Sequence, residues 1–138
     1  MPYLGLVTVV VRDYDEAIAF YVDALGFELR EDTDLGGGKR WVVVAPPGSR
    51  EAAVLLARAV TDGQEAAIGE QTGGRVGWFL NTEAFERDYA RMRDAGVEFE
   101  QAPRDEPYGT VAVFRDLYGN RWDLIQLLGD RADGDGAG

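Results

Sequence analysis

Two segments of this chain repeat the same order of features at a spacing of 70 residues. In the first, a β-branched run at 5–11 precedes an amphipathic helical pattern that ends at Gly26. In the second, a strand-like run at 74–80 precedes a helical pattern that ends at Gly96. Three further strand-like runs follow each helix, so the order βαβββ occurs twice. One such unit leaves an apolar sheet face uncovered, which is a physical reason for a chain to carry two.

Local signals mark the ends of both helices. Asp13 is a favourable N-cap with Glu16 three residues later, and we expect Thr82 to cap the second helix. Gly26 and Gly96 end the helices because glycine readily adopts the left-handed conformation. The remaining strands are predicted at 27–33, 40–45, 52–57, 97–101, 109–115 and 121–127.

The last two predicted strands form a hairpin around the segment 116–120, which reads DLYGN. Asp116 and Asn120 can hydrogen-bond the backbone of their own turn, and Gly119 is free to take a positive φ. The sequence therefore predicts a tight turn that closes the second βαβββ unit.

The domain prediction follows from this repeat. Residues 1–128 form one domain, with module one at 3–59 and module two at 74–128. The polar, glycine-containing segment 60–73 is expected to be the linker. The tail 129–138 consists mostly of glycine, aspartate and alanine, and we predict that it is disordered.

Composition excludes several kinds of chemistry. The chain has no cysteine and no histidine, so it offers no thiolate nucleophile, imidazole base or imidazole metal ligand. Its net charge of −11 would repel phosphate backbones, which argues against nucleic acid as a partner and would tolerate a cationic ligand. No apolar run is long enough to span a membrane and no signal peptide is recognisable, so we expect a cytoplasmic protein without a membrane partner.

Three segments carry a further signal: VRDYDEAIAFY at 11–21, LGF at 25–27 and FRDLYGNRWDL at 114–124. With them, the pattern across residues 3–128 resembles the vicinal oxygen chelate superfamily, which is also the glyoxalase/bleomycin resistance protein/dioxygenase fold. The resemblance implies an α+β fold in which two tandem βαβββ modules form a curled mixed sheet around a central cavity. It also implies a homodimer.

Members of this family that use a metal hold it with four side chains on the first, fourth, fifth and eighth strands. Mapped one position at a time, the first falls on Leu6, the third on Arg75 and the fourth on Asp123. The second falls near 52–54, where the register is open and Glu51 is close. Leucine cannot coordinate a metal and a guanidinium would repel one, so we predict no metal and no cofactor.

In place of the ion, Arg75 and Asp123 are predicted to pair across neighbouring strands. The pair either fills the vacated site or leaves Arg75 to bind an anionic or carbonyl group. Strand alternation assigns Trp78 and Trp122 to the core and Phe79 to the cavity. The residues expected to contact a ligand are Leu6, Trp41, Arg75, Phe79, Tyr108, Phe114 and Asp123.

Four functions stay open on this basis, and the last of them is a regulatory or structural domain. The first is a protein that binds or sequesters a small organic molecule in an aromatic-lined cavity without modifying it, as bleomycin resistance proteins do with cationic antibiotics. The second is a metal-dependent lyase, isomerase or dioxygenase of the same family. The third is metal-free catalysis with Asp123 as the acid or base, together with Tyr108 or Arg75.

Overall fold

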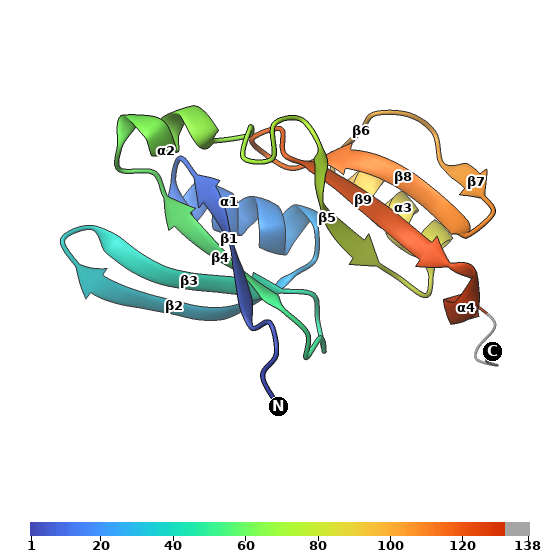
Figure 1. The fold of residues 1–138 in the computed structure, drawn as a ribbon, viewed down its shortest axis with the longest axis horizontal. Coiled ribbons are helices and arrows are strands. Elements are labelled where there is room, and N and C mark those ends of the chain that lie inside the picture. Colours follow the sequence, from blue (N-terminus) through green and yellow to red (C-terminus); the bar gives the residue numbers. More distant parts are fainter. Residues whose placement is uncertain (132–138) are drawn as a thin grey trace. The chain divides into compact units, whose positions relative to one another are not determined.

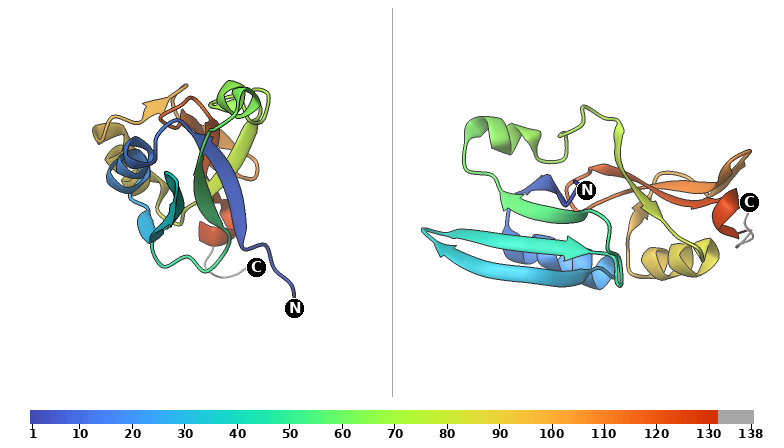
Figure 2. Two further views of the ribbon diagram at one scale, coloured as in Figure 1. Left: turned by 90° about the vertical axis from the view of Figure 1, so that its left-hand side faces the viewer. Right: turned by 60° about the horizontal axis from the view of Figure 1, so that its bottom comes forward.

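The computed structural model describes residues 1–131, which fall into two units divided between Gln71 and Thr72. Each unit contains one mixed sheet with a helix against one of its faces (Figures 1 and 2). The predicted α+β class with two βαβββ modules is confirmed, and the strands form two sheets, one in each unit.

Unit 1 is organised around a four-stranded sheet in the order β1-β4-β3-β2. Its elements are β1 (Leu6–Val11), α1 (Tyr14–Ala19), the π-helical turn η1 (Phe20–Ala24), β2 (Glu28–Gly36), β3 (Lys39–Ala45), β4 (Ala53–Arg58) and α2 (Asp62–Ala67). Strand β1 is parallel to β4, and the other pairs are antiparallel. Fully buried side chains from three strands, Val9, Val42 and Leu56, form the core of this unit.

The predicted ends of the first helix are confirmed. The Asp13 carboxylate accepts a hydrogen bond from the Glu16 backbone N–H at 2.9 Å, which caps α1. Gly26 has a φ of 79°, a conformation that glycine adopts without steric cost.

The segment 60–73 is more than a linker, because it contains helix α2. The Thr61 hydroxyl accepts a hydrogen bond from the Gln64 backbone N–H at 3.1 Å and caps the helix. The Thr-x-x-Gln spacing is the sequence signal for this start. The overall polarity of the segment concealed it.

Unit 2 repeats the arrangement with the strand order β5-β9-β8-β6, and β7 pairs with β8. Its elements are β5 (Val76–Asn81), α3 (Phe85–Asp94), β6 (Glu98–Phe99), β7 (Arg104–Glu106), β8 (Gly109–Arg115), β9 (Arg121–Leu127) and α4 (Leu128–Arg131). The strand predicted at 97–101 is reduced to two residues, and β7 was not predicted. The strands predicted at 109–115 and 121–127 are confirmed.

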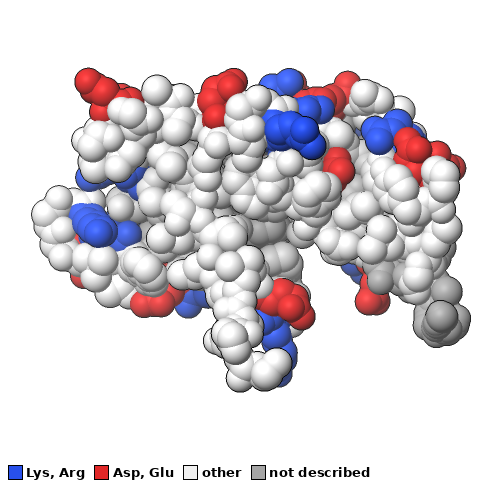
Figure 3. All heavy atoms as spheres, in the orientation of Figure 1, with Lys and Arg blue, Asp and Glu red and all other residues white. Residues whose placement is uncertain are grey.

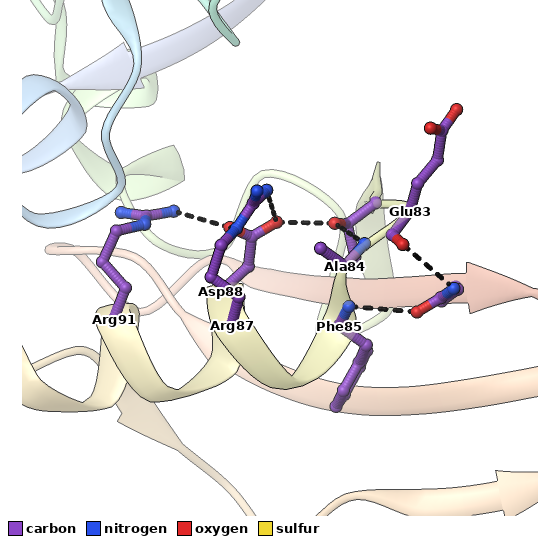
Figure 4. Close-up of polar contacts among 8 residues, drawn as sticks. Glu83, Ala84, Phe85, Arg87, Asp88 and Arg91 are labelled. Atoms are coloured by element: carbon purple, nitrogen blue, oxygen red, sulfur yellow. Dashed lines mark hydrogen bonds and ion pairs between the residues drawn. The ribbon is translucent and has the colours of Figure 1, made fainter. Parts of the chain in front are cut away.

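Helix α3 begins differently from the prediction. Thr82 lies two residues before the N-cap position, and its hydroxyl accepts a hydrogen bond from the Ala84 N–H at 2.9 Å. The Phe85 N–H donates to the side-chain carbonyl of Gln126, which reaches the helix from β9 (Figure 4). A backbone N–H at the start of this helix is therefore hydrogen-bonded by a residue 41 positions away, which the local sequence does not predict.

The turn between β8 and β9 forms as predicted. One oxygen of the buried Asp116 carboxylate accepts hydrogen bonds from the N–H groups of Tyr118 and Asn120, at 3.0 and 2.9 Å. The other oxygen accepts from the Asn120 side-chain amide. Gly119 has a φ of 97°.

The C-terminal segment departs from the predicted disorder of 129–138 at its start, because residues 129–131 belong to helix α4. The remainder of that prediction, 132–138, lies outside the described residues. Within residues 1–131, no helix is long and apolar enough to cross a membrane.

Candidate functional site

The sheet of unit 1 has a face that α1 does not cover, which we call open face 1. Alternation along β1 places Val9 and Val11 in the core and sends Thr8 and Val10 to this other face. The register pairs Thr8 with Leu55, a neighbour on β4. Short-chain and apolar residues from neighbouring strands thus form the floor of open face 1.

A pocket of about 400 Å³ borders this floor and continues toward α1 where β3 begins and β4 ends, because Tyr14 of α1, Arg40 and Arg58 also line it. The volume lies within the range of small-molecule sites. Half-buried Trp41 contributes an indole to the wall, and it packs with Leu55 against a small cluster of buried aliphatic residues. The lining residues are Thr8, Val10, Tyr14, Gly37, Lys39, Arg40, Trp41, Leu55, Leu56, Ala57, Arg58, Val60 and Gln64.

The pocket carries three basic residues, and one of them is fully engaged. Arg40 donates two hydrogen bonds to Asp32, at 3.1 and 2.7 Å, and one to Asp15 at 2.9 Å. Hydrogen bonds to these two carboxylates raise the pKa of Arg40, and the bond to Arg40 lowers the pKa of Asp32. Since Arg40 is paired twice, its charge is largely neutralised by its own neighbours.

Arg58 is held in a different way. Its guanidinium lies over the Tyr14 ring, 5.4 Å from the centroid, and the Arg40 guanidinium lies 5.1 Å from the same centroid. Within the described residues, no carboxylate lies at ion-pair distance from Arg58 or from Lys39. Two cations at the pocket are thus left without a neutralising carboxylate. Figure 3 shows basic side chains at the end of unit 1 where the β2–β3 hairpin lies.

Strand β1 lies at the edge of its sheet, and the side chain of Gln71 forms hydrogen bonds with its outer edge. The Gln71 amide accepts a hydrogen bond from the Val10 N–H at 2.9 Å and donates one to the Thr8 carbonyl at 2.6 Å. It takes the place of a neighbouring strand and holds two pocket-lining residues in position.

In unit 2, the sheet face away from α3 carries Asp123, and we call it open face 2. Asp123 lies on β9 between Phe79 of β5 and Val113 of β8. Burial raises the pKa of Asp123, while the charges of Arg104 and Arg121 oppose that rise. Within residues 1–131, the Asp123 side chain makes no hydrogen bond or ion pair. It is a half-buried carboxyl group without a direct partner.

The predicted pair of Arg75 and Asp123 does not form among the described residues. Asp123 lies opposite Phe79, four residues beyond Arg75, and a β-bulge between Val76 and Trp78 breaks the alternation on which the prediction rested. The prediction was wrong because the bulge changes which face of the sheet the preceding residues point to. The amino-acid sequence alone does not show that a bulge is present.

The cations that act on Asp123 are Arg121, on the same strand, and Arg104 on β7. Arg121 donates two hydrogen bonds of 2.8 Å to Glu100, and Arg115 forms an ion pair with the same carboxylate at 3.1 Å. The hydrogen bond from Arg121 is the main cause of the lowered pKa of Glu100. Because Arg121 is hydrogen-bonded to Glu100, its charge only partly opposes the rise in pKa that burial causes at Asp123.

The other residues predicted to contact a ligand belong to both units. Leu6 lies on β1 outside the pocket lining, and Phe79 and Tyr108 are 60% and 50% exposed on unit 2. Phe114 was assigned to the ligand site incorrectly. It is completely buried and stacks on Trp122 with the ring centroids 5.8 Å apart, so no surface remains for a ligand. The burial of Trp122 confirms its assignment to the core.

Arg58 and Lys39 were missed by sequence reasoning. The alternation of Leu6, Thr8 and Val10 was a sequence signal that could have predicted the pocket floor. No such signal marked the basic residues, because arginine at a strand end is ordinarily solvated. No group of three or more acidic side chains that could hold a metal ion occurs in residues 1–131.

Comparison with known proteins identifies relatives of this chain. A family model described as the Glyoxalase/Bleomycin resistance protein/Dioxygenase superfamily matches residues 3–124. An uncharacterized protein of Shewanella frigidimarina (strain NCIMB 400) is 57% identical over 122 residues, which cover 88% of this chain and 90% of that protein.

Solved structures extend the comparison to the fold. The crystal structure of UcmS2 is similar with a TM-score of 0.80 and 36% identity, over 91% of this chain and 98% of that one. The structure of TnmS3, an antibiotic binding protein from Streptomyces sp. CB03234, is similar with a TM-score of 0.75 and 31% identity. That match covers 92% of this chain and 97% of TnmS3.

Proposed function

Because the chain belongs to the glyoxalase/bleomycin resistance protein/dioxygenase superfamily, we propose that it binds a small organic molecule without modifying it. The ligand lies in the pocket that borders open face 1, against Trp41. The observation that carries the proposal is this pocket of about 400 Å³, which combines an indole and aliphatic side chains with polar and basic residues. Such a composition suits flat or amphipathic molecules.

The comparisons support the same proposal. TnmS3, which is 31% identical over nearly the whole chain, is described as an antibiotic binding protein. The resemblance maps Leu6 and Arg75 to the positions of metal ligands, and neither side chain is suited to hold a cation. We therefore propose a binding protein that uses no metal, and an antibiotic as one class of ligand. The homodimer remains a proposal on family grounds.

Native mass spectrometry of freshly purified protein, combined with elemental analysis, tests the metal-free binding function. We expect a homodimer that carries less than a tenth of an equivalent of divalent metal, together with any organic molecule that co-purifies. One equivalent of tightly held zinc, nickel, manganese or iron per chain would overturn the proposal in favour of the metal-dependent enzyme.

Substitutions on the two open faces test where the molecule binds. The probe is N-phenyl-1-naphthylamine, a neutral aromatic amine that fluoresces in apolar surroundings. Trp41→Ala should weaken its binding at least about fivefold, since aromatic contacts contribute roughly 1 kcal/mol or more. Phe79→Ala should leave it unchanged, and circular dichroism checks that both variants fold. The opposite ranking would move the binding site to open face 2.

One observation favours catalysis by Asp123 as a second candidate function. Burial raises its pKa toward the range of a general acid or base, and among the described residues its carboxyl group makes no hydrogen bond that would compete with a substrate. Such a group would exchange the protons next to the carbonyl of a bound ketone. Deuterium incorporation into the methyl group of acetophenone, followed by NMR, tests this role. Exchange that is faster with the wild-type chain than with Asp123→Asn would support it.

A further inference from the structure

We propose that the pocket that borders open face 1 selects aromatic molecules that carry an anionic group, with Arg58 as the residue that binds the anion. This inference rests on the proposed function, because it specifies the ligand class of the same pocket. It concerns charge, which neither the family nor the size of the pocket defines.

The first step is the balance of charge at the pocket. Its lining contains Lys39, Arg40 and Arg58 and no aspartate or glutamate. Arg40 is paired with Asp32 and Asp15, so its charge is compensated. Arg58 and Lys39 have no carboxylate at ion-pair distance within the part of the chain that the structure describes. The chain as a whole has a net charge of −11, so this positive local balance runs against its overall composition.

The second step is the position of Arg58. Its guanidinium is held over the Tyr14 ring, and the turn at Gly38 closes against it from the β2–β3 hairpin. A Cβ atom at Gly38 would lie 3.1 Å from the Arg58 Nη2 atom, and Gly38 has a φ of 84°. The aromatic ring and the glycine turn restrict the guanidinium, so less side-chain entropy is lost when it binds an anion.

The third step is the chemistry of the ligand. A guanidinium presents parallel N–H donors that match a carboxylate or sulfonate, and such charge-assisted bonds are stronger than neutral ones. The Trp41 indole and the aliphatic floor provide the complementary surface for an aromatic ring system. Together these groups fit an aromatic acid more closely than the cationic antibiotic that the net charge of the chain suggested.

Two fluorescent probes that differ in one group test this inference. 8-Anilinonaphthalene-1-sulfonate carries a sulfonate on the same ring skeleton as neutral N-phenyl-1-naphthylamine, and both become fluorescent in an apolar site. We expect the full-length wild-type protein to bind the sulfonate at least tenfold more tightly. Arg58→Gln should weaken sulfonate binding roughly tenfold or more, the range for hydrogen bonds to charged groups, and change binding of the neutral probe less than twofold.

Control variants separate the site from net charge and from folding. Arg50→Gln removes the same charge from an exposed position of unit 1 outside the pocket and should leave both affinities unchanged. Arg58→Lys keeps the charge but loses the planar donor pair, so it should restore part of the sulfonate affinity. Circular dichroism and the unaffected binding of the neutral probe show that each variant is folded.

The outcomes distinguish this inference from the function on which it rests. If both probes bind with equal affinity, or if Arg58→Gln and Arg50→Gln weaken sulfonate binding equally, the anion selectivity is wrong while the binding function stands. If neither probe binds the wild-type protein, or if Trp41→Ala alters neither affinity, the pocket does not hold aromatic molecules and both proposals fall.

Discussion

Replacing Gln71 with alanine should destabilise the edge strand β1, which carries part of the pocket floor, although Gln71 itself does not line the pocket. Gln71 lies outside the pocket lining, but its amide makes two hydrogen bonds to the outer edge of β1, one to Val10 and one to Thr8. Both of these residues line the pocket. The substitution removes both hydrogen bonds at once and leaves an unpaired strand edge.

The magnitude follows from the number and exposure of these bonds. A hydrogen bond contributes about 0.5–1.5 kcal/mol net, so two contribute about 1–3 kcal/mol. The bond to Val10 is partly buried and the bond to Thr8 is exposed, so water can replace the second more readily. We therefore expect Gln71→Ala to lower the free energy of unfolding by about 1–2 kcal/mol.

Urea unfolding measures this loss, and amide hydrogen exchange locates it. The Val10 amide should exchange faster in the variant, because its partner on the outer edge is gone, whereas amides within the β8–β9 hairpin should be unaffected. Gln101→Ala is the matched control, since Gln101 is an exposed glutamine that makes no hydrogen bond within the described residues. Its free energy of unfolding should stay within about 0.5 kcal/mol of the wild-type value.

Two results would refute this reasoning. The first is an equal free energy of unfolding for Gln71→Ala and Gln101→Ala. The second is unchanged protection of the Val10 amide in Gln71→Ala, which would mean that the edge of β1 does not depend on the glutamine.

Two further predictions concern unit 2. Burial raises the pKa of Asp123, so folding favours its protonated form; this contribution is present below the pKa of the unfolded chain and is lost as pH rises through the folded pKa. Asp123→Asn should therefore increase the free energy of unfolding at pH 7.5 but not at pH 3.5 in urea titrations, and a destabilised variant at pH 7.5 would contradict the raised pKa. Gly109 has a φ of 155°, and a Cβ atom there would overlap the Gln126 carbonyl oxygen. Gly109→Ala should therefore lower the free energy of unfolding by about 2–5 kcal/mol through backbone strain and overpacking. Gly96→Ala shares the positive φ without any atom within 4 Å, so it should cost about 1–2 kcal/mol; equal losses in urea unfolding would exclude the steric clash.

The order of elements could be predicted because its signals are local. Asp13 caps α1 within three residues, Gly26 and Gly96 end helices through their own φ, and Asp116 closes its turn through atoms at most four residues away. Each of these devices depends on the chemistry of a short segment. The repeated βαβββ order and the resemblance to the family can therefore be recognised from the amino-acid sequence alone.

The candidate site was less accessible, because it depends on register and on distant contacts. A single bulge before Trp78 removed the expected pairing of Arg75 with Asp123. Phe114 could not be distinguished from a pocket residue by type alone, since the same aromatic side chain suits a core or a ligand wall. The stacking of Phe114 on Trp122 decided the matter.

The sequence by itself determined the modules, the helix ends, the closing turn and the absence of imidazole and thiol chemistry. Only the tertiary structure decided which side chains gather at the pocket. Tyr14 on α1, Arg40 on β3 and Arg58 on β4 belong to three separate elements, but the fold of unit 1 brings both guanidinium groups over one ring. The physical reason is that helix caps and turns are set by neighbours along the chain. The charge of a pocket is set by which carboxylates the fold brings within reach, and here Arg40 receives two and Arg58 receives none among the described residues.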